Sequence, residues 1–244
     1  MLKALIFDVD GTLAETEELH RRAFNEIFTE ARLGWHWSVD QYRALLRTTG
    51  GKERMAQYRR TFGAAGPDDA TIAALHAAKT RRYGQLLRQG AIRLRPGVRA
   101  LMQQARTSGL LLGVATTTSR RNVDGLSRAC WDADAGDVFD AVAAGDEVSA
   151  KKPAPDVYEL ALKRLGLSPD EALAIEDSRN GLLSAKAAGI RVVVTPSAYI
   201  EHENLSDADI LLQDLTAFPA QALLPSAGSA ESRSCAGGEL SSRV

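Results

Sequence analysis

The 244-residue sequence contains few cysteines and no long apolar run. Two cysteines, Cys130 and Cys235, are too few for a disulfide scaffold and suit a reducing compartment. A bilayer-spanning helix needs about 20 consecutive apolar residues, and no run approaches that length. The chain opens instead on a short apolar run that is typical of a core strand. We therefore expect no signal peptide, no membrane segment and a cytoplasmic location.

An excess of charge of one sign is also missing. The chain carries 30 basic and 31 acidic residues, a formal net charge of −1, which taken whole says nothing about partners. We expect no nucleic-acid partner. The charge is unevenly distributed, because residues 15–90 hold 13 Lys/Arg and 9 Asp/Glu and are the more basic part. Chance variation of the surface explains this split as well as a functional role does.

The hydrophobic pattern predicts an α/β protein. Short, continuously apolar runs bounded by turn residues are typical of buried strands. They alternate with helical segments, as in a parallel sheet with right-handed crossovers. The expected strands are 2–7, 110–115, 138–143, 173–175 and 192–194, and the expected helices are 98–107, 123–129, 157–165 and 182–188.

Residues 15–90 interrupt this alternation and contain no convincing strand. Leu19, Ala23 and Ile27 recur at a spacing of four, as on one helix face. A second helix is indicated around residues 72–79, so we expect a helical insertion after the first strand. In residues 219–244, 14 of the 26 are Ala, Gly or Ser, which predicts a disordered tail.

Four polar segments follow predicted strands, at the edge where open α/β sheets bind ligands. The first, Asp8-Val9-Asp10-Gly11-Thr12, sends two carboxylates to one side of the chain as it leaves a strand. Such a pair is costly unless a cation joins it. The others are Thr116-Thr117-Thr118-Ser119, Lys151-Lys152 and Glu176-Asp177, which could supply an anion site, a positive charge and oxygen ligands for Mg²⁺. Alone, the Thr/Ser segment is more typical of a helix N-cap, the lysine pair could equally be a solvated charge pair in a loop, and Glu176-Asp177 could be a capped turn.

Together, in this order, the four segments resemble the motifs of the haloacid dehalogenase superfamily of phosphotransferases. The resemblance covers residues 1 to about 215. It implies a Rossmann-like, doubly wound parallel sheet in residues 1–14 and 91–218, with an inserted α-helical cap domain in residues 15–90. The cap segments 15–25 and 48–54 are further similar to the CbbY-type phosphatases. That likeness implies xylulose 1,5-bisphosphate, an inhibitory by-product of Rubisco, as the substrate.

The resemblance also implies roles for the motif residues. Asp8 attacks phosphorus and forms an aspartyl-phosphate, while Thr116 and Lys152 bind the transferring phosphoryl group. Asp10 acts as the general acid and then as the base for water, so we expect a raised pKa for Asp10 in the closed complex. The ligands implied for Mg²⁺ are Asp8, the backbone carbonyl of Asp10, Asp177 and, through water or less directly, Glu176.

The cap is expected to recognise the rest of the substrate, a small sugar phosphate, in a monomeric enzyme. Glu17 and His20 share a helix face and suit sugar hydroxyls, although a solvated face explains His20 as well. Arg43 and Lys52 suit the second phosphate, and Gly50 and Gly51 allow backbone N–H groups to approach it. The remaining residues expected to bind substrate are Thr49 and Thr117.

Three alternatives remain open. A β-phosphoglucomutase-like enzyme would use the same motifs and return the phosphoryl group to the sugar. A broad sugar-phosphate or phosphoglycolate phosphatase would accept many monophosphates. A receiver-like signalling domain would store phosphate on an aspartate, but the Asp-x-Asp-Gly-Thr order, the cap and the chain length argue against it.

Overall fold

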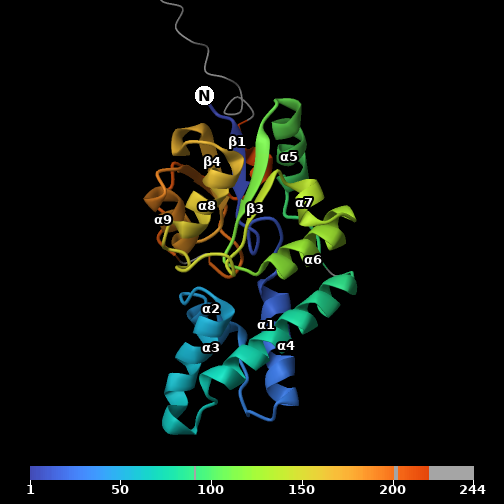
Figure 1. Cartoon of the computed structure of the whole chain (residues 1–244), viewed down its shortest axis with the longest axis vertical. Coiled ribbons are helices and arrows are strands. Elements are labelled where there is room, and N and C mark those ends of the chain that lie inside the picture. The colour runs from blue at the N-terminus through green and yellow to red at the C-terminus, as the bar shows by residue number, and fades with distance from the viewer. Residues whose placement is uncertain (91, 201–202, 220–244) are drawn as a thin grey trace, which may run out of the picture.

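The computed structural model describes residues 1–90, 92–200 and 203–219. Its larger part is a parallel sheet flanked by helices, and its smaller part is a group of helices beyond one end of the sheet (Figure 1). The expected Rossmann-like α/β fold with an inserted helical cap is therefore confirmed. The predicted disordered tail lies outside the described residues from position 220 onward.

In the described part of the chain the sheet has six strands in the order β3-β2-β1-β4-β5-β6, and all pairs are parallel. Because the central strands are continuously apolar, both faces of the sheet can be buried. Successive side chains alternate between the faces, so Leu5 and Phe7 enter one apolar cluster and Ile6 enters another. The strands are β1 (Ala4–Phe7), β2 (Leu111–Ala115), β3 (Ala141–Ala143), β4 (Ala172–Glu176), β5 (Arg191–Val194) and β6 (Ile210–Leu211).

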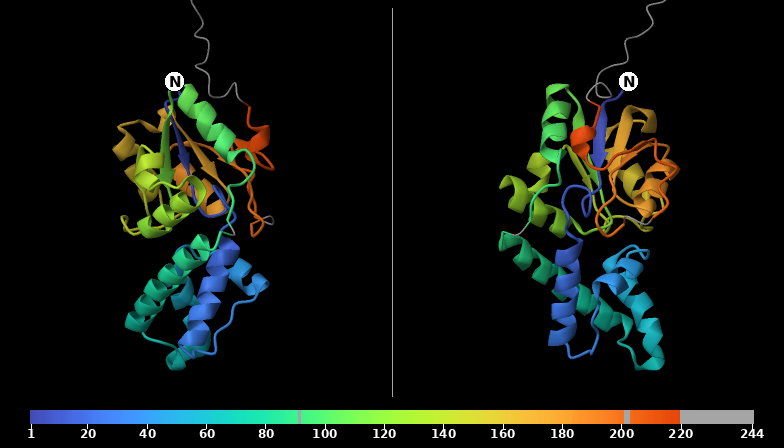
Figure 2. Two further views of the ribbon diagram at one scale, coloured as in Figure 1. Left: turned by 90° about the vertical axis from the view of Figure 1, so that its right-hand side faces the viewer. Right: turned by 180° about the vertical axis from the view of Figure 1, so that it is seen from behind.

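Helices cover both faces of the sheet (Figure 2). On one face pack α5 (Val98–Thr107) and α6 (Arg120–Trp131), and on the other pack α8 (Asp156–Leu165) and α9 (Arg179–Ala187). Full burial of one large aliphatic or aromatic side chain stabilises the fold by about 1.5–3 kcal/mol. The helix predicted over residues 98–107 is confirmed at both ends, whereas α6 and α9 each begin three residues before the predicted start, in polar first turns.

One predicted strand is partly wrong. The apolar pattern predicts an extended segment over 138–143, but Ala135–Val138 form the short helix α7 and only Ala141–Ala143 form a strand. A short apolar run does not distinguish helix from strand by itself. Here Asp134 begins the helical turn, and Asp140 exchanges hydrogen bonds with the backbone of Leu112 at the start of the pairing. The two-residue strand β6 was not predicted, because it is too short to show a period.

The helical part, called the cap below, has its own apolar cluster. Aromatic rings of Phe24, Phe28, Trp35, Trp37 and Tyr42 pack against one another with centroids 4.7–6.3 Å apart. Such aromatic pairs add about 0.5–1.5 kcal/mol beyond burial of their area. The cap helices are α1 (Glu17–Glu30), α2 (Val39–Leu45), α3 (Gly51–Arg59) and α4 (Asp69–Arg88), with the 3₁₀ segment Arg60–Ala65 between the last two.

The cap and the sheet part share side chains. Helix α4 runs from the cap up to α6 (Figure 1), and Leu86 and Leu87 at its end belong to the apolar cluster beneath the sheet. In the opposite direction, Ile200 from the segment after β5 is buried in the cap cluster. No helix in the described ranges is both long enough and apolar enough to cross a membrane.

Candidate active site

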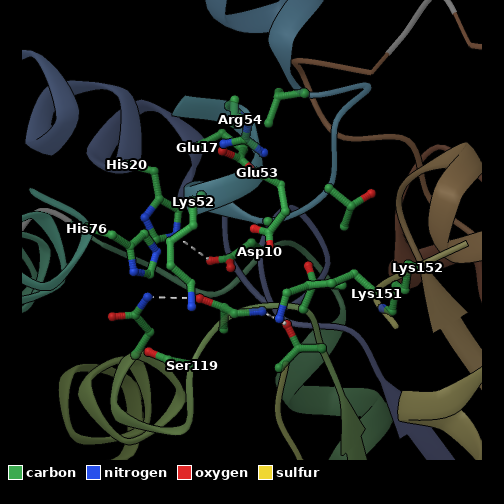
Figure 3. A pocket seen from close by; sticks show the side chains of 18 of the residues that line it. Asp10, Glu17, His20, Lys52, Glu53, Arg54, His76, Ser119, Lys151 and Lys152 are labelled. Atoms are coloured by element: carbon green, nitrogen blue, oxygen red, sulfur yellow. Dashed lines mark hydrogen bonds and ion pairs between the residues drawn. The ribbon is translucent and has the colours of Figure 1, made fainter. Parts of the chain in front are cut away.

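The predicted motif residues meet at one edge of the sheet. Because β1 lies between β2 and β4 and all three are parallel, the residues after these strands converge. Asp8, Thr116 and Asp177 line a cavity of about 410 Å³ between that edge and the cap. Figure 3 shows side chains from both parts of the molecule pointing into it.

Lys152 is the buried positive charge at the sheet end of this cavity. Its Nζ donates to Asp8 Oδ1 at 2.6 Å, to Glu176 Oε1 at 2.6 Å and to the carbonyl oxygen of Ala115 at 2.8 Å. Tyr158 Oη donates to the same Glu176 oxygen at 2.6 Å. Three acceptors therefore satisfy the three N–H groups of the ammonium and fix it beside the Asp8 carboxylate.

Three carboxylates lie close together at this point. Asp8, Glu176 and Asp177 are buried, and one oxygen of each lies within 4.8 Å of the others. Burial raises the pKa of Asp8 to about 7, although Lys152 lowers it. Burial, with the neighbouring Asp8 charge, raises the pKa of Asp177 well above its ordinary value. An all-oxygen set whose ionised form is this costly fits a hard divalent cation.

Glu176 differs from the other two carboxylates. Oε1 accepts hydrogen bonds from Lys152 and Tyr158, and Oε2 accepts one from the backbone N–H of Asp177 at 3.3 Å. A Cβ at Gly181 would overlap this carboxylate, so only glycine fits beneath it. Glu176 thus positions Lys152, while Asp8 and Asp177 face the cavity.

Gly11 allows the loop after β1 to approach Asp177. Its φ is +86°, a left-handed conformation that favours glycine. A Cβ at this position would overlap Oδ2 of Asp177. The glycine of the Asp-x-Asp-Gly-Thr motif is thus required twice, by its backbone conformation and by the carboxylate packed against it.

Asp10 is held by residues from the cap. Oδ1 accepts a hydrogen bond from Thr16 Oγ1 at 2.5 Å and lies 3.0 Å from His20 Nε2. The His20 ring stacks on Tyr83 with centroids 3.9 Å apart. Burial by itself raises the pKa of Asp10. The opposing effects of His20, Thr16 and the charge of Lys79 outweigh burial and lower this pKa to about 2. A histidine and a lysine from the cap thus stabilise the ionised carboxylate without substrate, and the raised pKa expected for the closed complex stays a prediction.

Lys79 was not predicted as a site residue. It lies on α4 and is only 4% exposed, with Nζ 2.6 Å from His20 Nδ1 and 4.5 Å from the centre of the Phe24 ring. Burial lowers the pKa of Lys79 to about 7, although Asp10 raises it. The available signal was a lysine beside the apolar face of Ile72 and Leu75. Such a lysine is more often a residue whose stem packs while its charge reaches solvent.

The cap contributes most of the predicted substrate residues to the cavity. Glu17 is held by Tyr42 Oη, which donates to it at 2.7 Å and accepts from Arg54 at 2.9 Å. Arg43 is not among the described residues that line the cavity; it pairs with Asp40 at 3.2 Å and its guanidinium lies over the Tyr199 ring. The predicted residues that do line it from the cap are Glu17, His20, Thr49, Gly50, Gly51 and Lys52.

Further polar residues line the cavity, and two of them, Asn180 and His76, were not predicted from the sequence. Asn180 at the start of α9 donates to Thr49 Oγ1 at 3.1 Å, which joins the sheet part to the cap loop. Ser119 and Thr117, both from the predicted segment 116–119, also line the cavity, and the buried Ser119 hydroxyl has no hydrogen-bond partner among the described residues. His76, whose pKa burial lowers to about 3, lies near Lys52 on the cap side (Figure 3). Neither Asn180 nor His76 stands at a spacing that sequence alone connects to the motifs.

Comparison with known proteins identifies this arrangement. A family model for haloacid dehalogenase-like hydrolases matches residues 2–189. The chain belongs to the haloacid dehalogenase-like hydrolases and, within them, to the CbbY-type phosphatases. It is 59% identical over 222 residues to the protein CbbY of Rhodobacter capsulatus, covering 91% of this chain and 97% of that protein. It is 52% identical over 212 residues to CbbY of Cereibacter sphaeroides, covering 87% of this chain and 92% of that one.

Solved structures agree with these relatives. CbbY from Rhodobacter sphaeroides in complex with phosphate superposes with a TM-score of 0.85 at 51% identity, covering 89% of this chain and 96% of that chain. A mutant of the same protein in complex with xylulose 1,5-bisphosphate superposes with a TM-score of 0.85 at 50% identity over the same shares. The resemblance expected from the motifs and the cap segments is confirmed, and the chain is an enzyme of this family.

Proposed function

We propose that this enzyme removes one phosphate from a sugar bisphosphate, converting xylulose 1,5-bisphosphate to xylulose 5-phosphate with Mg²⁺ bound. The observation that carries the proposal is a single cavity with positive charge at two ends. Lys152 lies beside Asp8 at the sheet end, and Lys52 lines the cap end. A sugar with two phosphates suits such a cavity. The complex of xylulose 1,5-bisphosphate with the CbbY mutant supports the same substrate.

In the proposed reaction, Asp8 is the nucleophile. A carboxylate oxygen of Asp8 forms a bond to phosphorus while the ester P–O bond breaks, which gives an aspartyl-phosphate and a sugar alkoxide. Lys152 and Thr116 bind the phosphoryl oxygens, whose charge would otherwise repel the nucleophile. The carboxylates of Asp8 and Asp177 and the backbone carbonyl of Asp10 would hold Mg²⁺. The ion would supply further charge neutralisation.

Asp10 carries the proton in both half-reactions. Its carboxyl gives a proton to the alkoxide, which leaves as the alcohol of xylulose 5-phosphate. The resulting carboxylate then takes a proton from a water molecule as the water oxygen attacks phosphorus. The bond between phosphorus and Asp8 breaks, so inorganic phosphate leaves and both carboxyl groups return to their starting states. His20 and Thr16 orient Asp10 through its Oδ1.

The substrate is tested by phosphate release. The enzyme should release inorganic phosphate from xylulose 1,5-bisphosphate with Mg²⁺, and EDTA should abolish the reaction. Ribulose 1,5-bisphosphate, the epimer, should react at least about 10-fold more slowly, because each hydrogen bond left unpaired costs about 1–3 kcal/mol. Equal rates on many monophosphates would contradict the bisphosphate assignment, and an isomerised sugar phosphate without free phosphate would indicate a mutase.

Two basic cap residues provide a matched comparison for the same assay. Lys52→Ala should raise the KM for the bisphosphate about 10-fold, because a charge-assisted hydrogen bond contributes about 1.5–3 kcal/mol. Arg43→Ala should leave KM unchanged, since Arg43 is occupied by Asp40 and Tyr199. An equal rise of KM in both variants would mean that the cap acts through its general charge.

The cation is tested by thermal unfolding at two pH values. Mg²⁺ at about 100 times its Kd should raise Tm by about 5–10 °C at pH 7.5, and the gain should be at most about half at pH 5.5. Protons compete for the site because the pKa of Asp8 is raised to about 7 and that of Asp177 is raised further.

The raised pKa of Asp8 determines how the stability of the metal-free protein changes with pH. Without metal, the stability that the raised pKa of Asp8 contributes is present below its ordinary value of 3.8 and is lost as the pH rises through about 7. Comparing Tm with and without Mg²⁺ at each pH isolates the site from other groups, such as His76, whose lowered pKa has the opposite effect. An equal gain at both pH values, or the same gain in Asp177→Asn, would contradict the assignment.

A further inference from the structure

Arg95 lies on the chain segment that returns from the cap to the sheet part, and its side chain is only 8% exposed. The guanidinium donates hydrogen bonds to the carbonyl oxygen of Gly11, to that of Thr195 at 2.7 Å and to that of Pro196 at 2.8 Å. Its Nε lies 3.1 Å from Glu15 Oε1. One side chain therefore joins the loop after β1, the loop after β5 and the start of the cap.

The two chain passages between cap and sheet part are also joined by their backbones at this point. Ala14 and Leu94 form an antiparallel bridge, and the backbone N–H of Arg95 donates to the carbonyl oxygen of Leu13 at 2.8 Å. Arg95 thus follows the bridge directly on the sheet side. The hydrogen bonds of its guanidinium go to the loops at the sheet edge where the motif residues meet, and not to the apolar cluster of the cap.

The contact with Gly11 leads directly to the proposed cation site. Gly11 packs against Oδ2 of Asp177 so closely that it has no room for a Cβ, and it immediately follows Asp10. The position of the Gly11 peptide therefore determines how near Asp177 and the Asp10 carbonyl can lie to Asp8. A hydrogen bond to the Gly11 carbonyl oxygen from a fixed, buried donor restrains that position.

The contacts with Thr195 and Pro196 hold the Arg95 guanidinium in place. Thr195 is buried, and its backbone N–H donates to the carbonyl oxygen of Glu176 at 2.8 Å, as part of the pairing beyond β4 and β5. The guanidinium is thus anchored on the same strand end that presents Asp177. A planar group with several N–H donors can hold carbonyl oxygens from two loops at once, which the single ammonium of a lysine does less well.

We propose that Arg95 is a positioning residue that holds the Gly11 loop against Asp177 and so sets the geometry of the cation site and of Asp10. The inference rests on the proposed function, because it concerns the same reaction. Arg95 lies behind the loop and acts through Gly11. Its removal should therefore weaken cation binding and slow the chemical steps while leaving recognition of the distal phosphate intact.

The test compares Arg95→Lys with Arg99→Lys. Arg99 is an exposed arginine on α5 whose guanidinium donates to a single carbonyl oxygen, that of Cys130, at 2.8 Å. Calorimetric titration with Mg²⁺ alone should give about 10-fold weaker binding for Arg95→Lys, in the range found for residues that orient metal ligands. Its kcat should fall by a similar factor with KM for the bisphosphate nearly unchanged. Arg99→Lys should match the wild type in all three quantities.

Wild-type Mg²⁺ affinity in a folded Arg95→Lys variant would overturn the proposal, even if Tm fell, because the role would then be structural only. If Arg95→Lys does not fold, Arg95→Gln carries the same expectations, since it keeps a planar amide donor and removes the buried charge. If the wild type binds Mg²⁺ but releases no phosphate from the bisphosphate, the proposed function fails. The calorimetric comparison of the variants would still decide the role of Arg95.

Discussion

Asp8→Asn should lower the rate of phosphate release by about 10³-fold or more, since the amide cannot form the aspartyl-phosphate. The substitution preserves the shape of the side chain and removes one of three buried carboxylates that lie within 4.8 Å of one another. The measurement is steady-state phosphate release, together with acid-quenched trapping of phosphorylated enzyme in the wild type. Phosphate release within about 10-fold of the wild-type rate would exclude Asp8 as the nucleophile.

The same variant has a stability readout that separates chemistry from misfolding. Burial raises the pKa of Asp8 to about 7, so its ionised form is costly at neutral pH despite Lys152. In the absence of metal, Asp8→Asn should therefore unfold at the same Tm as the wild type or at a higher one. A large loss of Tm would mean that the ion pair with Lys152 outweighs the repulsion among the carboxylates.

Asp10→Asn should reduce kcat by about 10²- to 10⁴-fold, the usual contribution of a general acid–base group. The asparagine can still accept the hydrogen bond of Thr16, and the backbone carbonyl at this position is retained. Stabilisation by Mg²⁺ should therefore persist. This combination of lost turnover and preserved cation binding distinguishes Asp10 from Asp8, whose replacement should weaken both.

The pH profile bears on how Asp10 obtains its proton. With its pKa lowered to about 2, Asp10 is ionised in the free enzyme at neutral pH, which suits the base role but not the acid role. Lys79 and His20 lie in a hydrogen-bonded line behind it, and the pKa of Lys79 is lowered to about 7. The pH–rate profile of the wild type should show a change in rate that the titration of Asp10 causes. The profile of Asp10→Asn should lack this change. Full activity and an unchanged profile in that variant would exclude the acid–base role.

The motif residues can be located from the sequence because each follows a predicted strand. Asp8, Thr116 and Asp177 follow buried parallel strands, and the carboxyl ends of such strands meet at one edge of the sheet. The positions of the Arg43 and Lys79 side chains depend on packing between segments that are distant in the chain. The hydrophobic period of a single segment does not show such packing. The Arg43 guanidinium lies over the ring of Tyr199, which is distant in the sequence. Lys79 is buried because α4 packs against α1, which carries His20. Arg95 contacts Gly11 and Thr195, which are 84 and 100 residues away from it in the chain, a relation visible only in three dimensions.

The exchange of apolar side chains between cap and sheet part has a consequence for engineering. Leu86 and Leu87 of the cap fill the core beneath the sheet, and Ile200 of the sheet part fills the core of the cap. A chimera that transplants residues 15–90 alone onto a related scaffold would create a mismatch in two cores at once. Truncating one buried leucine or isoleucine to alanine already costs about 2–5 kcal/mol. A cap with new specificity is therefore better grafted together with the segment around Ile200 and the α6 surface that receives Leu87.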